Sequence, residues 1–130
     1  MRPILALIIA SATASSAAAE SSAAKSAAFE ACAARAHGAT YPLLHCYSRE
    51  MQAADAALAG AFAAALANAR DPKTKAYLAR SQTAWLDYRD AWCEAGVARS
   101  GSLARLKLFE CRLALTASRT ADLNARVSPS

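Results

Sequence analysis

The chain has 130 residues, a formal net charge of +5 and a hydrophobic fraction of 55%. This length predicts one domain, and because alanine inflates the apolar fraction, few large side chains remain to build its core. The mild positive charge favours binding to anionic surfaces but does not identify which surface. The chain has no Gly-rich loop of the kind that binds phosphate.

Residues 1–19 have the pattern of a secretory signal peptide. An arginine near the start precedes an apolar run at residues 4–10, and a stretch of small residues follows. We expect cleavage after Ala19, with Ala14 as the alternative. The run is far shorter than the ~20 residues that span a bilayer. We therefore expect a periplasmic or secreted protein, with no transmembrane segment after signal removal.

The mature chain is expected to form one helical domain over residues 20–126, followed by a disordered tail at 127–130. Its first helix is predicted from composition over residues 20–36, and Gly38 suits the position just after it. A second helix is predicted from Pro42, in its first turn, to about residue 70. Helical spacing gives this second helix one buried face, made of Leu44, Met51, Leu58 and Phe62.

A third helix is predicted to begin at Asp71-Pro72, an N-cap followed by proline at the first helical position. It should run to about Ala98. Apolar and small side chains spaced by three and four residues predict the seam that packs on neighbouring helices. The predicted seam consists of Leu78, Ser81, Trp85, Tyr88 and Trp92.

The last helix is predicted from about Leu103 to Arg126, after a turn in which Gly101 ends the third helix and Ser102 caps the fourth. No strand-like alternation of apolar and polar residues stands out. We therefore predict an all-α fold, a small antiparallel helical bundle of three long helices plus a short N-terminal helix.

The four cysteines lie symmetrically about the two predicted hairpin turns. Cys93 and Cys111 are each nine residues from Ser102, and Cys32 and Cys46 are equidistant from a turn near residue 39. Residues equidistant from the turn of an antiparallel hairpin lie side by side. Of the three possible connectivities, the sequence favours two hairpin disulfides, Cys32–Cys46 and Cys93–Cys111, which suits an exported chain.

A metal site is the alternative use of this region, because His37 and His45 lie close to Cys32 and Cys46. No CxxC or HxxxH spacing supports it, so we expect no metal and no cofactor. No motif joins a nucleophile to a base either, so we expect that the protein is not an enzyme.

A distributed motif gives the sharper prediction. It consists of Cys46, Asp55-x-x-Leu58, Gln82-x-x-Trp85-x-x-Tyr88-Arg89-Asp90-x-x-Cys93, Gly101-Ser102, Cys111, Thr116-x-x-Arg119 and Leu123. In this motif the chain resembles the family named after the N-terminal domain of the lysozyme inhibitor LprI, over about residues 30–125. Ala59 stands where that family usually has Asn. The resemblance implies an exported, disulfide-bonded helical domain that inhibits a lysozyme-like protein by direct binding.

The polar residues of this motif have a structural interpretation. Asp55, Arg89 and Arg119 come from three different predicted helices, and a buried or half-buried network among them would hold the bundle in register. The alternative is that Arg89 binds a partner.

Four arginines on the last helix form a row, because Arg105, Arg112, Arg119 and Arg126 are seven residues apart and a helix drifts only ~20° per heptad. We expect Arg119 to be used internally. The other three form either an ordinary solvated face or a docking face for an anionic envelope surface, which would make the protein an envelope adaptor. Export disfavours nucleic acid as a partner. The row also counts against strongly basic lysozymes, because like charges slow their encounter.

Overall fold

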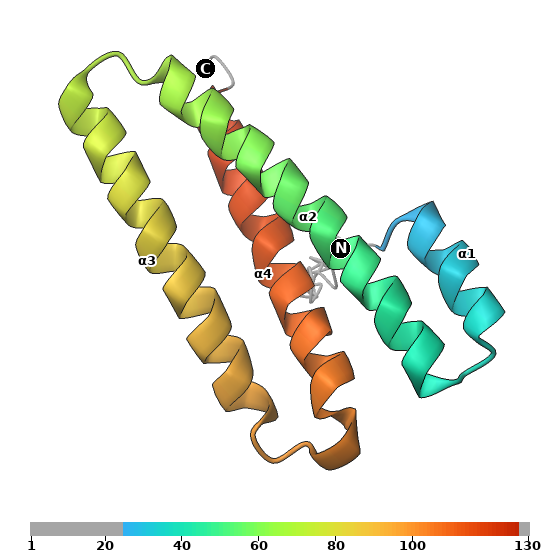
Figure 1. Cartoon of the computed structure of the whole chain (residues 1–130). Helices are drawn as coiled ribbons and strands as arrows, with labels where there is room; N and C mark the ends of the chain where they lie inside the picture. Colours follow the sequence, from blue (N-terminus) through green and yellow to red (C-terminus); the bar gives the residue numbers. More distant parts are fainter. Residues whose placement is uncertain (1–24, 128–130) are drawn as a thin grey trace, which may run out of the picture.

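The computed structural model describes residues 25–127, which form four α-helices and one 3-10 turn (Figure 1). Their bounds are α1, Ala27–Ala36; α2, Thr40–Asn68; α3, Pro72–Val97; η1, Gly101–Leu103; and α4, Ala104–Val127. The described part contains no strand, so the predicted all-α fold is confirmed. The expected signal peptide at residues 1–19, its cleavage site and residues 128–130 of the expected tail lie outside the described residues.

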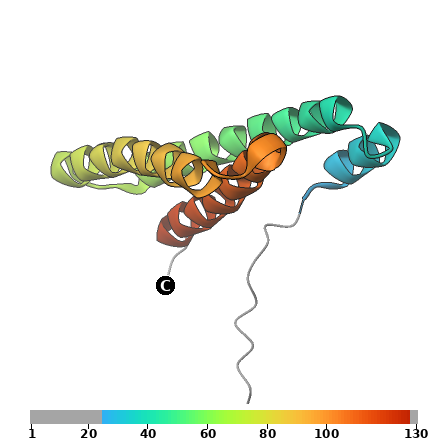
Figure 2. The ribbon, with the colours of Figure 1, turned by 90° about the horizontal axis from the view of Figure 1, so that it is seen from below.

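The bundle is built around the pair of long helices α2 and α4, which make the most extensive helix contact. Helix α3 packs mainly on α4 and touches α2 only sparsely, whereas α1 packs on α2. Figure 2 shows α4 lying on one side of the layer that α2 and α3 form. No helix within residues 25–127 is both long enough and apolar enough to cross a bilayer.

The core consists of two apolar clusters along the α2–α4 contact. One joins α1, α2 and α4 through Phe29, Cys46, Tyr47, Met51 and Leu113. The other joins α2 and α4 through Leu58, Ala61, Ala65 and Leu123. Leu58 and Leu123 of the family motif therefore serve the core, where burying a leucine contributes about 1.5–3 kcal/mol.

The predicted disulfides are both present. Cys32 bonds to Cys46 and Cys93 bonds to Cys111, with 5.7 Å between the Cα atoms of each pair. The first bond joins α1 to α2 and the second joins α3 to α4. Each therefore closes one helical hairpin, as the symmetry of the sequence predicts.

Local side-chain chemistry decides where the helices begin and end. Helix α1 begins at Ala27, because the Ser26 hydroxyl accepts the backbone N–H of Phe29 at 3.1 Å and so caps it. The predicted start of this helix at residues 20–24 lies outside the described residues. As predicted, Gly38 follows α1 in a left-handed conformation, at φ 78°. The carboxylate of Asp71 accepts the backbone N–H of Thr74 at 2.8 Å. Hydrogen bonds from the backbone and the side chain of Thr74 hold the pKa of the Asp71 carboxyl below its ordinary value.

The predicted cap of the last helix is wrong. Gly101 and Ser102 lie in the turn between α3 and α4, as expected, but both belong to η1, and α4 begins only at Ala104. Gly101 has φ 56°, a left-handed conformation that glycine adopts without steric cost. The chain thus reverses through a 3-10 turn instead of a serine-capped helix start.

The predicted seam of α3 is right at Trp85, which packs on the second apolar cluster, but wrong by one residue at Ser81, Tyr88 and Trp92. Tyr88 and Trp92 are 49% and 60% exposed, whereas Arg89 and Cys93, the residues that follow them, are buried together with Gln82. Cys93 has to face α4 to reach Cys111, and the preceding residue on a helix points about 100° away. The disulfide therefore turns Tyr88 and Trp92 outward, where their rings stack at 5.9 Å between centroids.

Candidate functional site: a buried arginine cluster and a basic end

Arg89 is the centre of a polar cluster that joins three helices. Its Nη1 donates to Asp55 Oδ1 on α2 at 2.9 Å and to Thr116 Oγ1 on α4 at 3.1 Å. Its Nε donates to Asp90 Oδ1 at 3.0 Å, and its guanidinium lies 5.5 Å from the centroid of the Trp85 ring. Because Arg89 is only 8% exposed, these contacts leave it little surface for a partner.

Arg119 forms the second half of the cluster. Its Nε donates to Gln82 Oε1 at 3.1 Å and its Nη2 donates to Ser81 Oγ at 3.0 Å. It also approaches the Trp85 ring, at 6.0 Å from the centroid. The structure thus brings together the polar motif residues that lie far apart in the sequence, and it uses them to hold α3 against α2 and α4.

The arginine row of α4 is divided by this packing. Arg112 Nη2 donates to Glu94 Oε1 at 3.3 Å, and its Nε lies 3.1 Å from Asp90 Oδ1 as an ion pair without hydrogen-bond alignment. Arg112 and Arg119 are therefore both engaged with α3. Arg105 and Arg126, at the two ends of the row, are exposed.

The sequence did not reveal a second polar group, which lies in the first apolar cluster. The hydroxyl of buried Tyr47 donates to a carboxylate oxygen of Glu110, and Lys25 Nζ lies 2.8 Å from that same oxygen. Burial first, and then Glu110, raise the pKa of Tyr47 above its ordinary value. Tyr47 and Glu110 are 63 residues apart and share no motif, so no sequence signal pairs them.

A groove lies between α2 and α3, with a volume of about 470 Å³. Apolar side chains such as Phe62 and Leu86 line it, together with Gln82 and Arg89 of the polar cluster. Ala59 also lines this groove. The family usually has asparagine at this position, so alanine here leaves the wall of the groove without that polar side chain.

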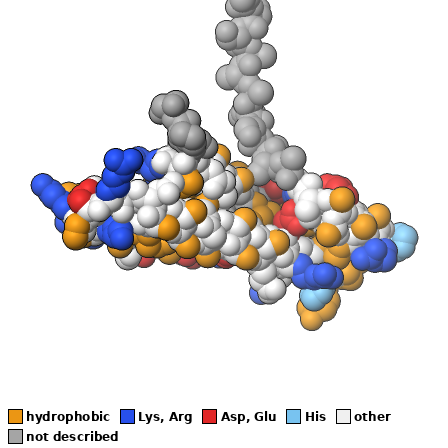
Figure 3. Space-filling view, turned by 90° about the horizontal axis from the view of Figure 1, so that it is seen from above, with side chains coloured by type: hydrophobic (Ala, Val, Ile, Leu, Met, Phe, Trp, Pro, Cys, Tyr) orange, Lys and Arg blue, Asp and Glu red, His pale blue; other side chains and the backbone are white. Residues whose placement is uncertain are grey.

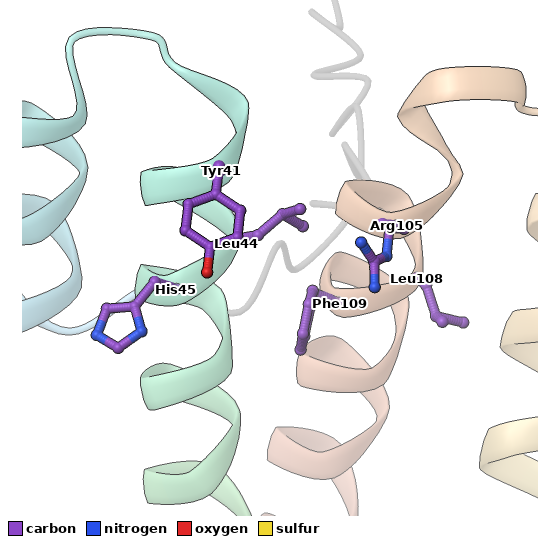
Figure 4. Close-up of a pocket in the computed structure, with 6 residues that line it drawn as sticks. All are labelled: Tyr41, Leu44, His45, Arg105, Leu108 and Phe109. Carbon is purple, nitrogen blue, oxygen red and sulfur yellow. The ribbon is translucent and has the colours of Figure 1, made fainter.

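A second hollow, of about 380 Å³, lies at the end of the bundle where α2 and α4 begin. It is lined by Tyr41, Leu44, His45, Arg105, Leu108 and Phe109. Figure 4 shows Tyr41 and Leu44 on α2 and, across the space between the two helices, Arg105 and Phe109 on α4. We name this part of the molecule the basic end. It comprises residues 35–45 and 97–108.

Metal ligands do not gather in the described part of the chain. Among residues 25–127, no three His, Cys, Asp or Glu side chains are arranged to hold an ion. All four cysteines are bonded in disulfides. The two histidines that the sequence placed near the cysteines are exposed.

These features define a small helical domain closed by two hairpin disulfides and held in register by a buried arginine cluster. The chain belongs to the family described as lysozyme inhibitor LprI, whose family model matches residues 11–123. The resemblance seen in the sequence motif is therefore confirmed. No curated protein and no solved structure gives a significant match.

Proposed function

We propose that this protein inhibits lysozyme-type muramidases by binding them directly, and that it is not an enzyme. The match to the LprI lysozyme inhibitor family over residues 11–123 carries this proposal. Many protein inhibitors bind through a surface whose backbone changes little on binding.

The construction of the domain supports such a surface. Two disulfides and the Arg89 cluster fix how the four helices sit relative to one another. A surface that is already ordered loses less conformational entropy when it binds. The rigid bundle therefore suits binding to a preformed cleft.

The disulfides also support a location outside the reducing cytosol. Structural disulfides form and persist in secreted and periplasmic proteins, and residues 1–19 have the pattern of a signal peptide. We therefore propose a periplasmic or secreted protein. Muramidases act on the cell wall, which such a protein can reach.

The test is an activity titration of several lysozymes with the oxidised, mature domain, at low and at moderate salt. Two substrates are needed, cell-wall particles and a soluble oligosaccharide, because a basic protein that merely coats anionic particles also slows their lysis. We expect saturable loss of activity at one defined stoichiometry with both substrates. Unchanged turnover of the soluble substrate by every lysozyme would contradict the proposal.

The same titration tests the alternative function, an envelope adaptor that docks on anionic surfaces. The exposed side chains of Arg105 and Arg126 favour it, although Arg112 is engaged with Asp90 and Glu94. Binding to an anionic surface is strongly salt-dependent. Slower lysis of particles alone, lost at moderate salt, would favour the adaptor.

A further inference from the structure

The basic end carries only positive ionisable charge. Residues 35–45 and 97–108 contain no aspartate and no glutamate. The two segments meet in the hollow between the starts of α2 and α4 and lie at the lower end of the bundle in Figure 1. Their basic and potentially basic side chains, all exposed, are Arg35, His37, His45, Arg99, Arg105 and Lys107.

Apolar side chains accompany this charge. Tyr41 is 85% exposed and Leu103 is 53% exposed, and Leu44 and Phe109 line the hollow beside them. Figure 3 shows hydrophobic side chains projecting next to Lys, Arg and His at the end of the molecule formed by α1 and the start of α2. Tyrosine and arginine are, with tryptophan, the side chains enriched at the energetic centres of protein interfaces.

Arg105 differs from the two middle arginines of the row, Arg112 and Arg119. Arg112, seven residues on, is engaged with Asp90 and Glu94, and Arg119 is bonded to Gln82 and Ser81. Within residues 25–127, no ion pair or side-chain hydrogen bond holds Arg105. It therefore presents a solvent-exposed guanidinium without a protein partner beside an apolar hollow.

We infer that the basic end is the surface that enters the active-site cleft of the muramidase, with Arg105 directed at the carboxyl groups of that cleft. The inference rests on the proposed function and deepens it. Glycoside hydrolases of this kind work with a pair of Asp or Glu residues that flank the scissile bond. A guanidinium matches a carboxylate with two parallel hydrogen bonds.

Charge complementarity selects this surface over the two other candidates. The groove between α2 and α3 contains Arg89, but Asp55 and Asp90 already neutralise it. The hollow beside Trp92 contains a lysine, Lys107, but no guanidinium. Of these three surfaces in the described part of the chain, the basic end is the one that combines an unpaired guanidinium with an exposed aromatic ring. Its hollow is lined by no acidic side chain that would repel the carboxylates.

The test compares charge reversals at the two exposed ends of the arginine row. Arg105→Glu changes the basic end, and Arg126→Glu makes the same change of net charge on the same helix at the opposite end of the bundle. With the soluble substrate, we expect Arg105→Glu to raise the inhibition constant at least about tenfold, and Arg126→Glu by less than about threefold. Arg105→Lys should fall between the wild type and Arg105→Glu, because lysine lacks the planar fork.

A second measurement locates the contact on the partner. An oligosaccharide that fills the active-site cleft should compete with the domain for the muramidase in a direct binding assay. A muramidase whose catalytic glutamate is replaced by glutamine should bind the wild-type domain more weakly. The affinity of the neutral variant Arg105→Gln for the muramidase should change little on the same replacement. Tyr41→Ala should weaken binding without loss of helicity, because the tyrosine ring is largely exposed to solvent.

The outcomes separate this inference from the proposed function. If the wild type inhibits and Arg105→Glu and Arg126→Glu weaken inhibition equally, the docking surface alone is overturned. The same holds if the oligosaccharide and the domain bind the muramidase at the same time. Failure of the wild type to inhibit any muramidase overturns both. Circular dichroism and melting temperature verify that each variant is folded, and Arg105→Gln replaces Arg105→Glu if the reversal unfolds the domain.

Discussion

At the scale of single residues, Arg89 is the most heavily used side chain in the described part of the protein. It contacts Asp55 on α2, Thr116 on α4 and Asp90 on its own helix. Trp85 covers one side of the guanidinium. Since α3 touches α2 only sparsely, this one side chain supplies much of the specific contact between the two helices.

Arg89→Ala should therefore lower the free energy of unfolding by about 2 kcal/mol, the usual size of lost hydrogen bonds to a charged group. The loss stays moderate because Asp55 and Asp90 are partly exposed and remain solvated. Arg105→Ala is the matched control and should change stability by less than about 0.5 kcal/mol. Urea unfolding measures both, and equal effects would contradict the role assigned to Arg89.

The residue scale also shows what a sequence can reveal about such a cluster. Asp55, Arg89 and Arg119 could be proposed as partners because a family motif groups them. Tyr47 and Glu110 could not, because neither belongs to a motif and only the packing of α2 on α4 brings them together. A pair created by tertiary contact alone leaves no local pattern to detect.

At the scale of helices, α3 shows why periodicity alone does not fix a buried face. Apolar spacing pointed to Tyr88 and Trp92, yet the polar Gln82 and Arg89 are buried in their place. The polar side chains can be buried because their hydrogen bonds are satisfied. The disulfide at Cys93 then fixes the rotation of the helix.

The two tryptophans should consequently behave differently. Trp85→Ala removes a half-buried ring that packs on the apolar cluster of Leu58 and Leu123, and should cost about 2 kcal/mol, below the range for fully buried tryptophan. Trp92→Ala removes an exposed ring and should cost less than about 1 kcal/mol. Chemical denaturation tests this, and acrylamide should quench the fluorescence of Trp92 more strongly than that of Trp85.

At the scale of the whole molecule, the bundle consists of two disulfide-bonded helical hairpins, which pack on each other through α2 and α4. Helix α1 is bonded to α2 and α3 is bonded to α4. This organisation was predictable, because the symmetry of the cysteines about two turns is a property of the sequence. The open groove between α2 and α3 was not predictable, because it depends on how two hairpins dock.

Removal of the second disulfide should release α3 before the rest of the bundle. The Cys93→Ser and Cys111→Ser double variant loses about 3 kcal/mol by the loop-entropy estimate. Its α3 amides should exchange with deuterium faster than those of α2 and α4. The matched double variant Cys32→Ser and Cys46→Ser should instead speed exchange in α1, and uniform acceleration along the chain in both variants would contradict the two-hairpin description.

The order of the cysteines also governs how the native bonds form. The first cysteine pairs with the second and the third with the fourth, across separations of 14 and 18 residues. If the chain is exported as proposed, an oxidase that joins thiols in the order in which they emerge from a translocation pore makes only native bonds. Cys32 and Cys46 can then be joined before Cys93 appears, and this order of pairing requires no disulfide isomerase to reshuffle crossed pairs.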